Sequence, residues 1–266
     1  CNLWFIYLSN GGIFAFMLIA NNIIISIICF YKINNIFFCK TRFLTWTKYS
    51  QNPVLSQIPI EANQTSDFRD PFVWKEGNTW YMVVGSRIKD VGGVVFLYRS
   101  ANLLDWEYLH PLLAGSDTSK GAIWECPNFF KIGDYWVLII SAHTGTRTDT
   151  VHYFVGEYQN LQFTPFSTGV LDYGCMYAPL SFIDDQGRRL LFGWLREERS
   201  NEALNQAGWA GVQSIPRVLG LDSQNRLTMN PVAELERIRG QHHYREASRL
   251  DLPISLDVGT SSLDIA

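Results

Sequence analysis

Two acidic residues that stand just before prolines are the strongest candidates for chemistry in this chain. Asp70 belongs to the run FRDP at residues 68–71, and Glu125 belongs to the run WECP at residues 124–127. Paired carboxylates that flank one pocket suit the cleavage of a glycosidic bond, in which one protonates the leaving oxygen and the other attacks the sugar or activates water. A lone Asp before a proline is usually a turn residue, so this interpretation requires a fold that brings both acids together.

An internal repeat predicts such a fold. Superimposing Pro71 on Pro127 also matches four later positions, which pair Trp74 with Phe130, Lys75 with Lys131, Gly77 with Gly133 and Trp80 with Trp136. Repeats of about 50 residues are typical of propellers and related arrays, in which each unit is one small sheet. We expect the two acids to occupy the same phase of their units and to face each other across a shared centre.

Strand patterns bounded by turns recur along the chain. The first full unit has strands at 80–85, 94–98 and 105–108, and the second has strands at 135–140, 151–155 and 161–164. A third unit opens at 177–179, and a less regular fourth spans 209–231. The run LTWT at residues 44–47 resembles the outer strand of a unit whose inner strands are not evident upstream. These patterns predict an all-β fold, a five-bladed β-propeller with its first blade truncated.

Composition narrows the classes of partner. The net charge is −3 and no basic stripe is present, which argues against nucleic acid. The five cysteines are scattered without metal-ligand spacing, so we expect neither a metal site nor a disulfide framework. Aromatic residues make up 14% of the chain, a content that suits both a β-rich core and stacking on sugar rings. This aromatic content is compatible with a small carbohydrate as partner.

Residues 1–42 differ from the rest of the chain. They contain no Asp or Glu, the first acid is Glu61, and residues 12–30 are almost wholly apolar. Three interpretations stay open for this hydrophobic segment: a membrane-spanning anchor, a signal peptide without a basic leader, and a stretch that is not native coding sequence. The first residue is Cys1, and a composition rich in Ile, Asn, Phe and Tyr is typical of translated AT-rich DNA. Localisation therefore stays open, with a membrane contact expected only if residues 12–30 are a native anchor.

The two acidic runs resemble motifs of glycoside hydrolase family 32, which includes invertases, levanases and inulinases. Residues 68–71 resemble the family's Arg-Asp-Pro motif, and residues 124–127 resemble its Glu-Cys motif, in the same order. Residues 52–55 and 209–217 are also similar to family segments, and the resemblance covers about residues 43–240. It implies a five-bladed propeller that hydrolyses β-fructofuranosides such as sucrose or fructans with retention and without a metal or cofactor.

The resemblance also implies roles for individual residues. Glu125 would be the general acid/base, and Asp70 would hold fructosyl hydroxyls and stabilise the transition state. The predicted substrate-binding residues are the neighbours of these two acids: Arg69, Phe68, Trp124 and Cys126.

This sequence departs from the family pattern at both ends. The family's nucleophile is an Asp in an Asn-Asp-Pro motif on the first blade, and residues 1–60 contain no acid that could replace it. A β-sandwich module follows the propeller in the family. We therefore expect a partial propeller glycosidase domain at 43–235, a linker and the start of a truncated sandwich at 236–266, and impaired activity.

Two alternatives stay open beside the hydrolase. One is a non-catalytic propeller that uses Asp70 and Glu125 to recognise sugar hydroxyls. The other is a different five-bladed glycosidase such as an arabinanase, against which the Glu-Cys-Pro context argues.

Overall fold

The computed structural model describes residues 15–20, 23–30, 33–41, 45–62, 67–116, 118–143 and 148–240. The chain divides into two units, residues 1–231 and 232–266. In the second unit the described structure includes the 3-10 helix η3 (Ala233–Ile238). All of the strands that the structure describes lie in the first unit, and β-structure dominates the described part of the chain, as predicted.

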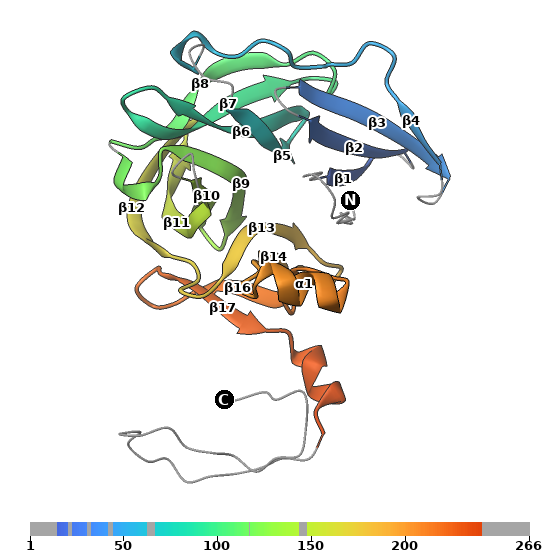
Figure 1. Ribbon diagram of the computed structural model, residues 1–266. Coiled ribbons are helices and arrows are strands. Elements are labelled where there is room, and N and C mark those ends of the chain that lie inside the picture. The colour runs from blue at the N-terminus through green and yellow to red at the C-terminus, as the bar shows by residue number, and fades with distance from the viewer. Residues whose placement is uncertain are drawn as a thin grey trace. The chain divides into compact units, whose positions relative to one another are not determined.

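The described strands of the first unit form four antiparallel sheets, and in three of these sheets the strands pair strictly in chain order (Figure 1). The first sheet contains β1 (Ala15–Ala20), β2 (Ile23–Phe30), β3 (Ile33–Thr41) and β4 (Thr45–Lys48). The second contains β5 (Phe68–Glu76), β6 (Thr79–Ile88), β7 (Gly92–Ser100) and β8 (Glu107–Ala114). Such four-stranded meanders are the blades of a β-propeller.

The third and fourth sheets follow the same plan with one addition. The third contains β9 (Ile123–Ile132), β10 (Tyr135–His143), β11 (Thr148–Gln159) and β12 (Gln162–Val170). The fourth contains β13 (Met176–Ile183), β14 (Arg189–Leu195), β16 (Arg217–Leu221) and β17 (Leu227–Pro231), and the short β15 (Val212–Gln213) also pairs with β14. The described part of the first unit also contains three short helices: η1 (Ile60–Ala62), η2 (Thr118–Lys120) and α1 (Asn201–Ala207).

The blades pack face to face through apolar and aromatic side chains. Residues 94–98 of β7 and 137–142 of β10 are buried without a break, because central strands of a propeller are covered on both faces. Phe129 is fully buried and lies 4.7 Å from Trp136 within its own sheet and 5.3 Å from Trp74 of the neighbouring sheet, measured between ring centroids. The high aromatic content of the sequence therefore serves blade packing at these positions.

The innermost strands share a distortion that matters for the site. Asp70, Cys126 and Ala178 each precede a proline and have positive φ angles of 58°, 47° and 49°. The strand pairing shifts register at each of these positions. Proline removes a donor from the hydrogen-bond ladder, and a bulge turns the strand and re-aims the side chains beside it. The proline repeat in the sequence therefore marks three equivalent bulges on β5, β9 and β13.

The first sheet differs from the prediction of a truncated first blade. Its backbone includes β1, β2 and β3, where the sequence pattern indicated no inner strands. The anchor interpretation required one long helix over residues 12–30, and the structure has two antiparallel strands there instead. Isoleucine dominates β2, and a β-branched side chain favours a strand over a helix. Within the described residues, no helix is both long and apolar enough to cross a bilayer. The origin of residues 1–42 stays a prediction.

The expected fourth unit at residues 209–231 is wrong. The strands β15, β16 and β17 extend the sheet that begins with β13. Residues 209–231 therefore complete the third full repeat and do not form a repeat of their own. Helix α1 lies between β14 and β15, and this insertion lengthens the spacing until the outer strands resemble a new repeat. The described residues contain four sheets, and the count of five blades stays a prediction.

Replacing Phe129 by alanine should lower the free energy of unfolding by about 3–5 kcal/mol, the usual cost of removing a fully buried aromatic ring. Urea denaturation of the full chain measures this loss. Phe166→Ala is the matched control, because Phe166 is 51% exposed and contacts the ring of Tyr135 at its edge. Equal losses in the two variants would contradict the assignment of Phe129 to the centre of the blade packing.

Candidate active site

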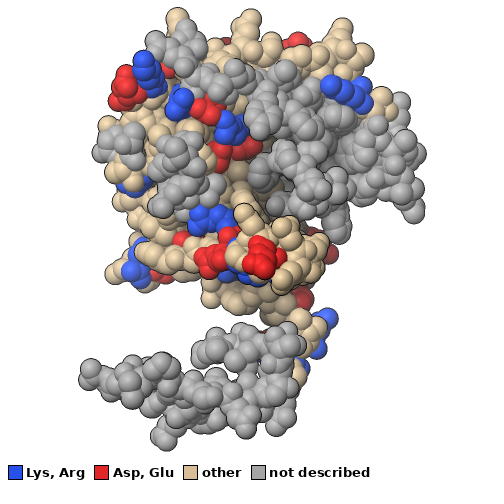
Figure 2. Space-filling model, in the orientation of Figure 1, with Lys and Arg blue, Asp and Glu red and all other residues tan. Residues whose placement is uncertain are grey.

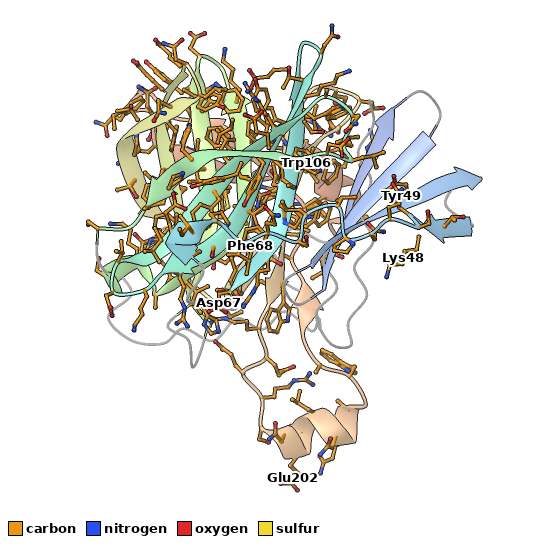
Figure 3. The ribbon with its side chains drawn as sticks, turned by 90° about the horizontal axis from the view of Figure 1, so that it is seen from above. Lys48, Tyr49, Asp67, Phe68, Trp106 and Glu202 are labelled. Carbon is orange, nitrogen blue, oxygen red and sulfur yellow. The ribbon has the colours of Figure 1, made fainter. Side chains whose placement is uncertain are left out.

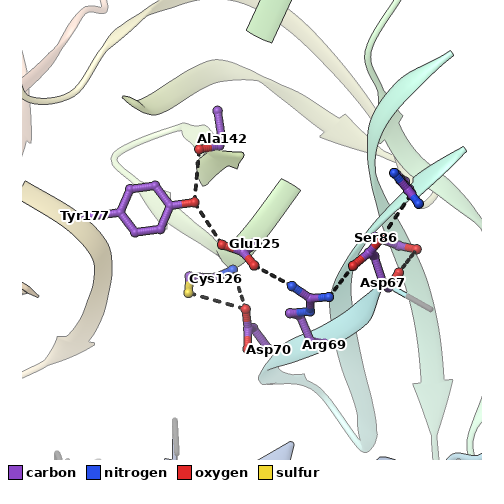
Figure 4. A network of polar contacts seen from close by, with 9 residues as sticks. Asp67, Arg69, Asp70, Ser86, Glu125, Cys126, Ala142 and Tyr177 are labelled. Atoms are coloured by element: carbon purple, nitrogen blue, oxygen red, sulfur yellow. Dashed lines mark hydrogen bonds and ion pairs between the residues drawn. The ribbon is translucent and has the colours of Figure 1, made fainter. Parts of the chain in front are cut away.

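The two predicted acidic motifs meet where β5 lies beside β9 (Figure 4). Arg69 donates from Nη1 to Oε1 of Glu125 at 2.6 Å. Asp70 accepts the backbone N–H of Cys126 at Oδ2 with a distance of 3.0 Å, and the Cys126 thiol lies 3.4 Å from the same oxygen. The structure therefore brings together four of the six predicted site residues: Arg69, Asp70, Glu125 and Cys126.

The prediction that the two acids occupy the same phase of the repeat is wrong by one residue. Both contacts join residues that are 56 positions apart, which pairs Arg69 with Glu125 and Asp70 with Cys126. Inner strands of neighbouring blades lie side by side, so residues at the same phase of the repeat contact each other. A basic residue therefore faces Glu125 at the matching phase, and the second acid lies one position further along β5.

Tyr177 of β13 is a site residue that the sequence reasoning missed. Its hydroxyl lies 2.8 Å from Oε2 of Glu125 and 3.0 Å from the backbone oxygen of Ala142. Tyr177 stands two positions before Pro179, as Glu125 stands two positions before Pro127. Extending the proline alignment to the third unit would have indicated this contact. Glu125 is thus held between Arg69 on one side and Tyr177 on the other (Figure 4).

Burial dominates the electrostatics of Asp70, which is only 6% exposed. Loss of solvation raises the pKa of Asp70 to about 6, and the nearby Glu125 carboxylate also raises it. The hydrogen bond from the Cys126 backbone and the charge of Arg69 act in the opposite direction. An acid with this pKa changes its charge near neutral pH, which is unusual for an aspartate.

The Cys126 thiol supports Asp70 as a hydrogen-bond donor. Burial raises the pKa of Cys126 well above its usual value, and the charges of Asp70 and Glu125 raise it further. The thiol therefore stays protonated and directs its hydrogen towards Asp70. A thiol in this state is a poor nucleophile, so its contribution is to the environment of the two acids.

Arg69 connects the site to a further acid, Asp67, which the sequence reasoning also missed. Nη2 of Arg69 donates to Oδ1 of Asp67, and Nε of Arg87 lies 3.0 Å from Oδ2 of the same carboxylate. Burial lowers the pKa of Arg69, but the charges of Glu125 and Asp67 outweigh this and raise the pKa overall. Arg69 therefore remains a cation between two carboxylates.

The other two predicted substrate-binding residues lie in the core. Phe68 is 1% exposed and packs against Tyr98, and Figure 3 shows it among the packed side chains. Trp124 is also 1% exposed, and its Nε1 donates to the backbone oxygen of Lys120 at 2.8 Å. Side chains alternate along a strand, so Phe68 and Trp124, which precede Arg69 and Glu125, point into the sheet packing. Phe68 and Trp124 therefore pack in the core beside the site residues and do not line the site.

A close approach of two sheets brings β9 to this position. A Cβ on Gly85 of β6 would lie 2.3 Å from the backbone oxygen of Trp124, so only glycine fits there.

Charged side chains elsewhere on the described surface are mixed in sign on the face drawn in Figure 2. Among the described residues no group of three or more His, Cys, Asp and Glu side chains is arranged to hold a metal ion.

Solved structures with this fold share the strand arrangement of the chain. A GH32 beta-fructofuranosidase of Bombyx mori superposes with a TM-score of 0.74 at 28% identity, covering 85% of this chain and 52% of that one. Fructan 1-exohydrolase IIa of Cichorium intybus superposes with a TM-score of 0.72 at 26% identity, covering 84% of this chain and 47% of that one.

Sequence relatives point to the same family. A sucrose-6-phosphate hydrolase of Zymomonas mobilis is 38% identical over 203 residues, which is 70% of this chain and 39% of that protein. Beta-fructofuranosidase insoluble isoenzyme 2 of Daucus carota is 36% identical over 225 residues, 74% of this chain and 36% of that protein. This chain therefore spans less than half the length of these relatives.

The family model for the glycosyl hydrolases family 32 N-terminal domain matches residues 29–231. The match begins inside the segment 1–42 that the sequence pattern had set apart, and it includes the strands from β3 to β17. It covers most of the chain and both acidic motifs, which confirms the predicted resemblance. The chain belongs to glycosyl hydrolases family 32.

Proposed function

We propose that the site acts on terminal β-fructofuranosyl bonds of sucrose or fructans, with Glu125 as the general acid/base. The observation that carries this proposal is the position of Glu125, whose two oxygens are bound separately by Arg69 and Tyr177 beside the buried Asp70. The names of the relatives, sucrose-6-phosphate hydrolase and beta-fructofuranosidase, support this substrate class. A small carbohydrate is therefore the proposed partner.

The surroundings of Glu125 fit a residue that gains and loses a proton. The Tyr177 hydroxyl can donate its one hydrogen either to Glu125 or to the Ala142 backbone oxygen, which can only accept. When Glu125 is ionised, Tyr177 donates to it. When Glu125 carries a proton, it can donate to Tyr177, and the hydroxyl hydrogen turns to Ala142. Glu125 and Tyr177 thus stay hydrogen-bonded to each other in both states, which lowers the cost of the proton transfer.

Asp70 is proposed to hold the sugar. Its Oδ2 accepts from Cys126, so Oδ1 can accept a hydroxyl of the fructosyl ring. An ionised carboxylate close to the anomeric carbon also stabilises the positive charge that develops there in the transition state. In this role Asp70 must lose its proton before it can act.

One observation favours a weaker activity in this chain or a purely sugar-binding role. Residues 1–60 contain no Asp or Glu, so the nucleophile that the family resemblance assigns to the first blade has no counterpart there. A retaining reaction without its nucleophile loses most of its rate. We propose that this chain by itself hydrolyses fructosides slowly, and the alternative is a non-catalytic sugar-binding propeller.

An external anion should reveal the acid function of Glu125. We expect slow release of glucose from sucrose by the full chain, an increase when formate or azide is added, and at least a roughly 100-fold loss of the assisted rate in Glu125→Gln. A small anion can occupy the place of a missing carboxylate, whereas the general acid must still protonate the glucose oxygen. Glucose release is measured by a coupled assay, and Asp134→Asn, in the exposed β9–β10 turn, is the control.

Sucrose binding without any glucose release, with or without the anion, would contradict the hydrolase and favour the sugar-binding alternative. Release that persists unchanged in Glu125→Gln would contradict the role of Glu125. Activity on arabinan but not on sucrose would contradict the substrate class.

Asp70→Asn should change how stability depends on pH. The pKa of Asp70 is raised to about 6 in the folded chain, so the folded state binds a proton between about pH 4 and pH 6 that the unfolded state has released. The contribution of Asp70 to the stability of the wild type therefore falls by roughly 3 kcal/mol as pH rises through this window. The variant lacks this titration, although the same groups face position 70, namely Glu125, Arg69 and Cys126.

The free energy of unfolding of Asp70→Asn minus that of the wild type should thus become more positive by up to roughly 3 kcal/mol between pH 4 and pH 7. Urea denaturation at each pH measures this difference, and Asp134→Asn should show no such trend. A difference that stays constant with pH would show that burial does not raise the pKa of Asp70.

A further inference from the structure

Asp67 immediately precedes β5 and is buried beside the proposed active site. It is 9% exposed, and two arginines bind opposite sides of its carboxylate. Arg69 donates from Nη2 to Oδ1, and Arg87 of β6 lies 3.0 Å from Oδ2 through Nε. The hydroxyl of Ser86 also donates to the backbone oxygen of Asp67, which fixes the backbone at this point. Figure 4 shows these contacts as one connected network with Glu125.

The geometry of an arginine makes the Asp67 contact consequential for Glu125. A guanidinium group is planar, and its two Nη atoms have fixed positions relative to each other. Because Asp67 holds Nη2, the plane of Arg69 cannot turn without losing that bond, and Nη1 is directed at Oε1 of Glu125. A guanidinium with Glu125 as its only partner could instead turn towards Asp70, the next residue along the chain.

We propose that Asp67, itself held by Arg87, is a positioning residue that orients Arg69 and balances its charge beside Glu125. The inference rests on the proposed function only for the role given to Glu125. Ion pairs connect four residues of alternating charge across two blades, in the order Arg87, Asp67, Arg69 and Glu125, and we call this row the charge chain.

Charge alternation predicts effects of opposite sign for the two outer members of the chain. Asp67 offsets part of the positive charge of Arg69, so removing the Asp67 charge should make the surroundings of Glu125 more positive and favour its ionised form. Arg87 offsets Asp67, so removing the Arg87 charge should disfavour the ionised form. The other charged or titratable groups that face Glu125 are unchanged in both variants: Arg69, Asp70, Cys126 and Tyr177.

The test is a titration of the Glu125 side-chain carboxyl carbon by ¹³C NMR in the full chain, with the resonance assigned by its absence from Glu125→Gln. In Asp67→Asn, which keeps an oxygen for Arg69, we expect the titration midpoint to fall by about one pH unit, the lower end of the effect of a nearby charge. In Arg87→Gln we expect the midpoint to rise. Arg99→Gln is the matched control, because Arg99 pairs with Glu107 in an exposed ion pair on β7 and β8.

Midpoints that stay at the wild-type value in both variants, or that move in the same direction, would overturn the proposal. If Asp67→Asn does not fold, the direction of the shift in Arg87→Gln decides. Sugar turnover does not enter this measurement, so opposite shifts without any sucrose hydrolysis would support the charge chain while the proposed function fails.

Discussion

The contact between Arg69 and Glu125 is the interaction on which the site depends. It joins the innermost strands of two blades at the same phase of the repeat, with a separation of 2.6 Å between Nη1 and Oε1. Both side chains are mostly removed from water, with exposed fractions of 30% and 13%. A charge in such a place requires a partner, because burial of an unpaired ion costs several kcal/mol. The ion pair therefore ties the chemistry of the site to the packing of the blades.

The bulges before the prolines make this contact possible. At Asp70 and Cys126 the backbone takes positive φ, a conformation that costs a non-glycine residue of order 1 kcal/mol or more. The same distortion recurs at Ala178, where no acid is present. The bulge is thus a property of the propeller repeat, and the individual blades differ in the side chains that they place on it: arginine and aspartate, glutamate and cysteine, tyrosine and alanine.

Much of the site could be predicted from the sequence because the site residues lie at or next to equivalent positions of the internal repeat. The prolines at 71 and 127 indicated that Asp70 and Glu125 would meet, and the strand patterns indicated β6, β7, β10 and β11. Tyr177 was missed because a tyrosine on a buried strand usually belongs to the core. Asp67 was missed because an aspartate before a strand usually belongs to a turn, and its contact with Arg87 joins two strands.

The first sheet was hard to predict for a different reason. A continuous apolar run has the same appearance in a buried strand and in a membrane helix, and periodicity cannot separate them. In the fourth sheet, the insertion of α1 moved β16 away from β14 along the chain, and hydrogen bonding between distant segments is not visible in local patterns. The packing roles of residues next to the two acidic motifs, such as Phe68 and Trp124, follow from strand alternation only once it is known which face of the strand points into the core.

A double-mutant cycle between Arg69 and Glu125 measures the central interaction most directly. The free energy of unfolding is determined for the wild type, Arg69→Gln, Glu125→Gln and the double variant at pH 7. Each single variant leaves a charge without its main partner, whereas the double variant removes both charges. The predicted result is a coupling free energy of about 2 kcal/mol, and effects that add within about 0.5 kcal/mol would contradict an ion pair that organises the site.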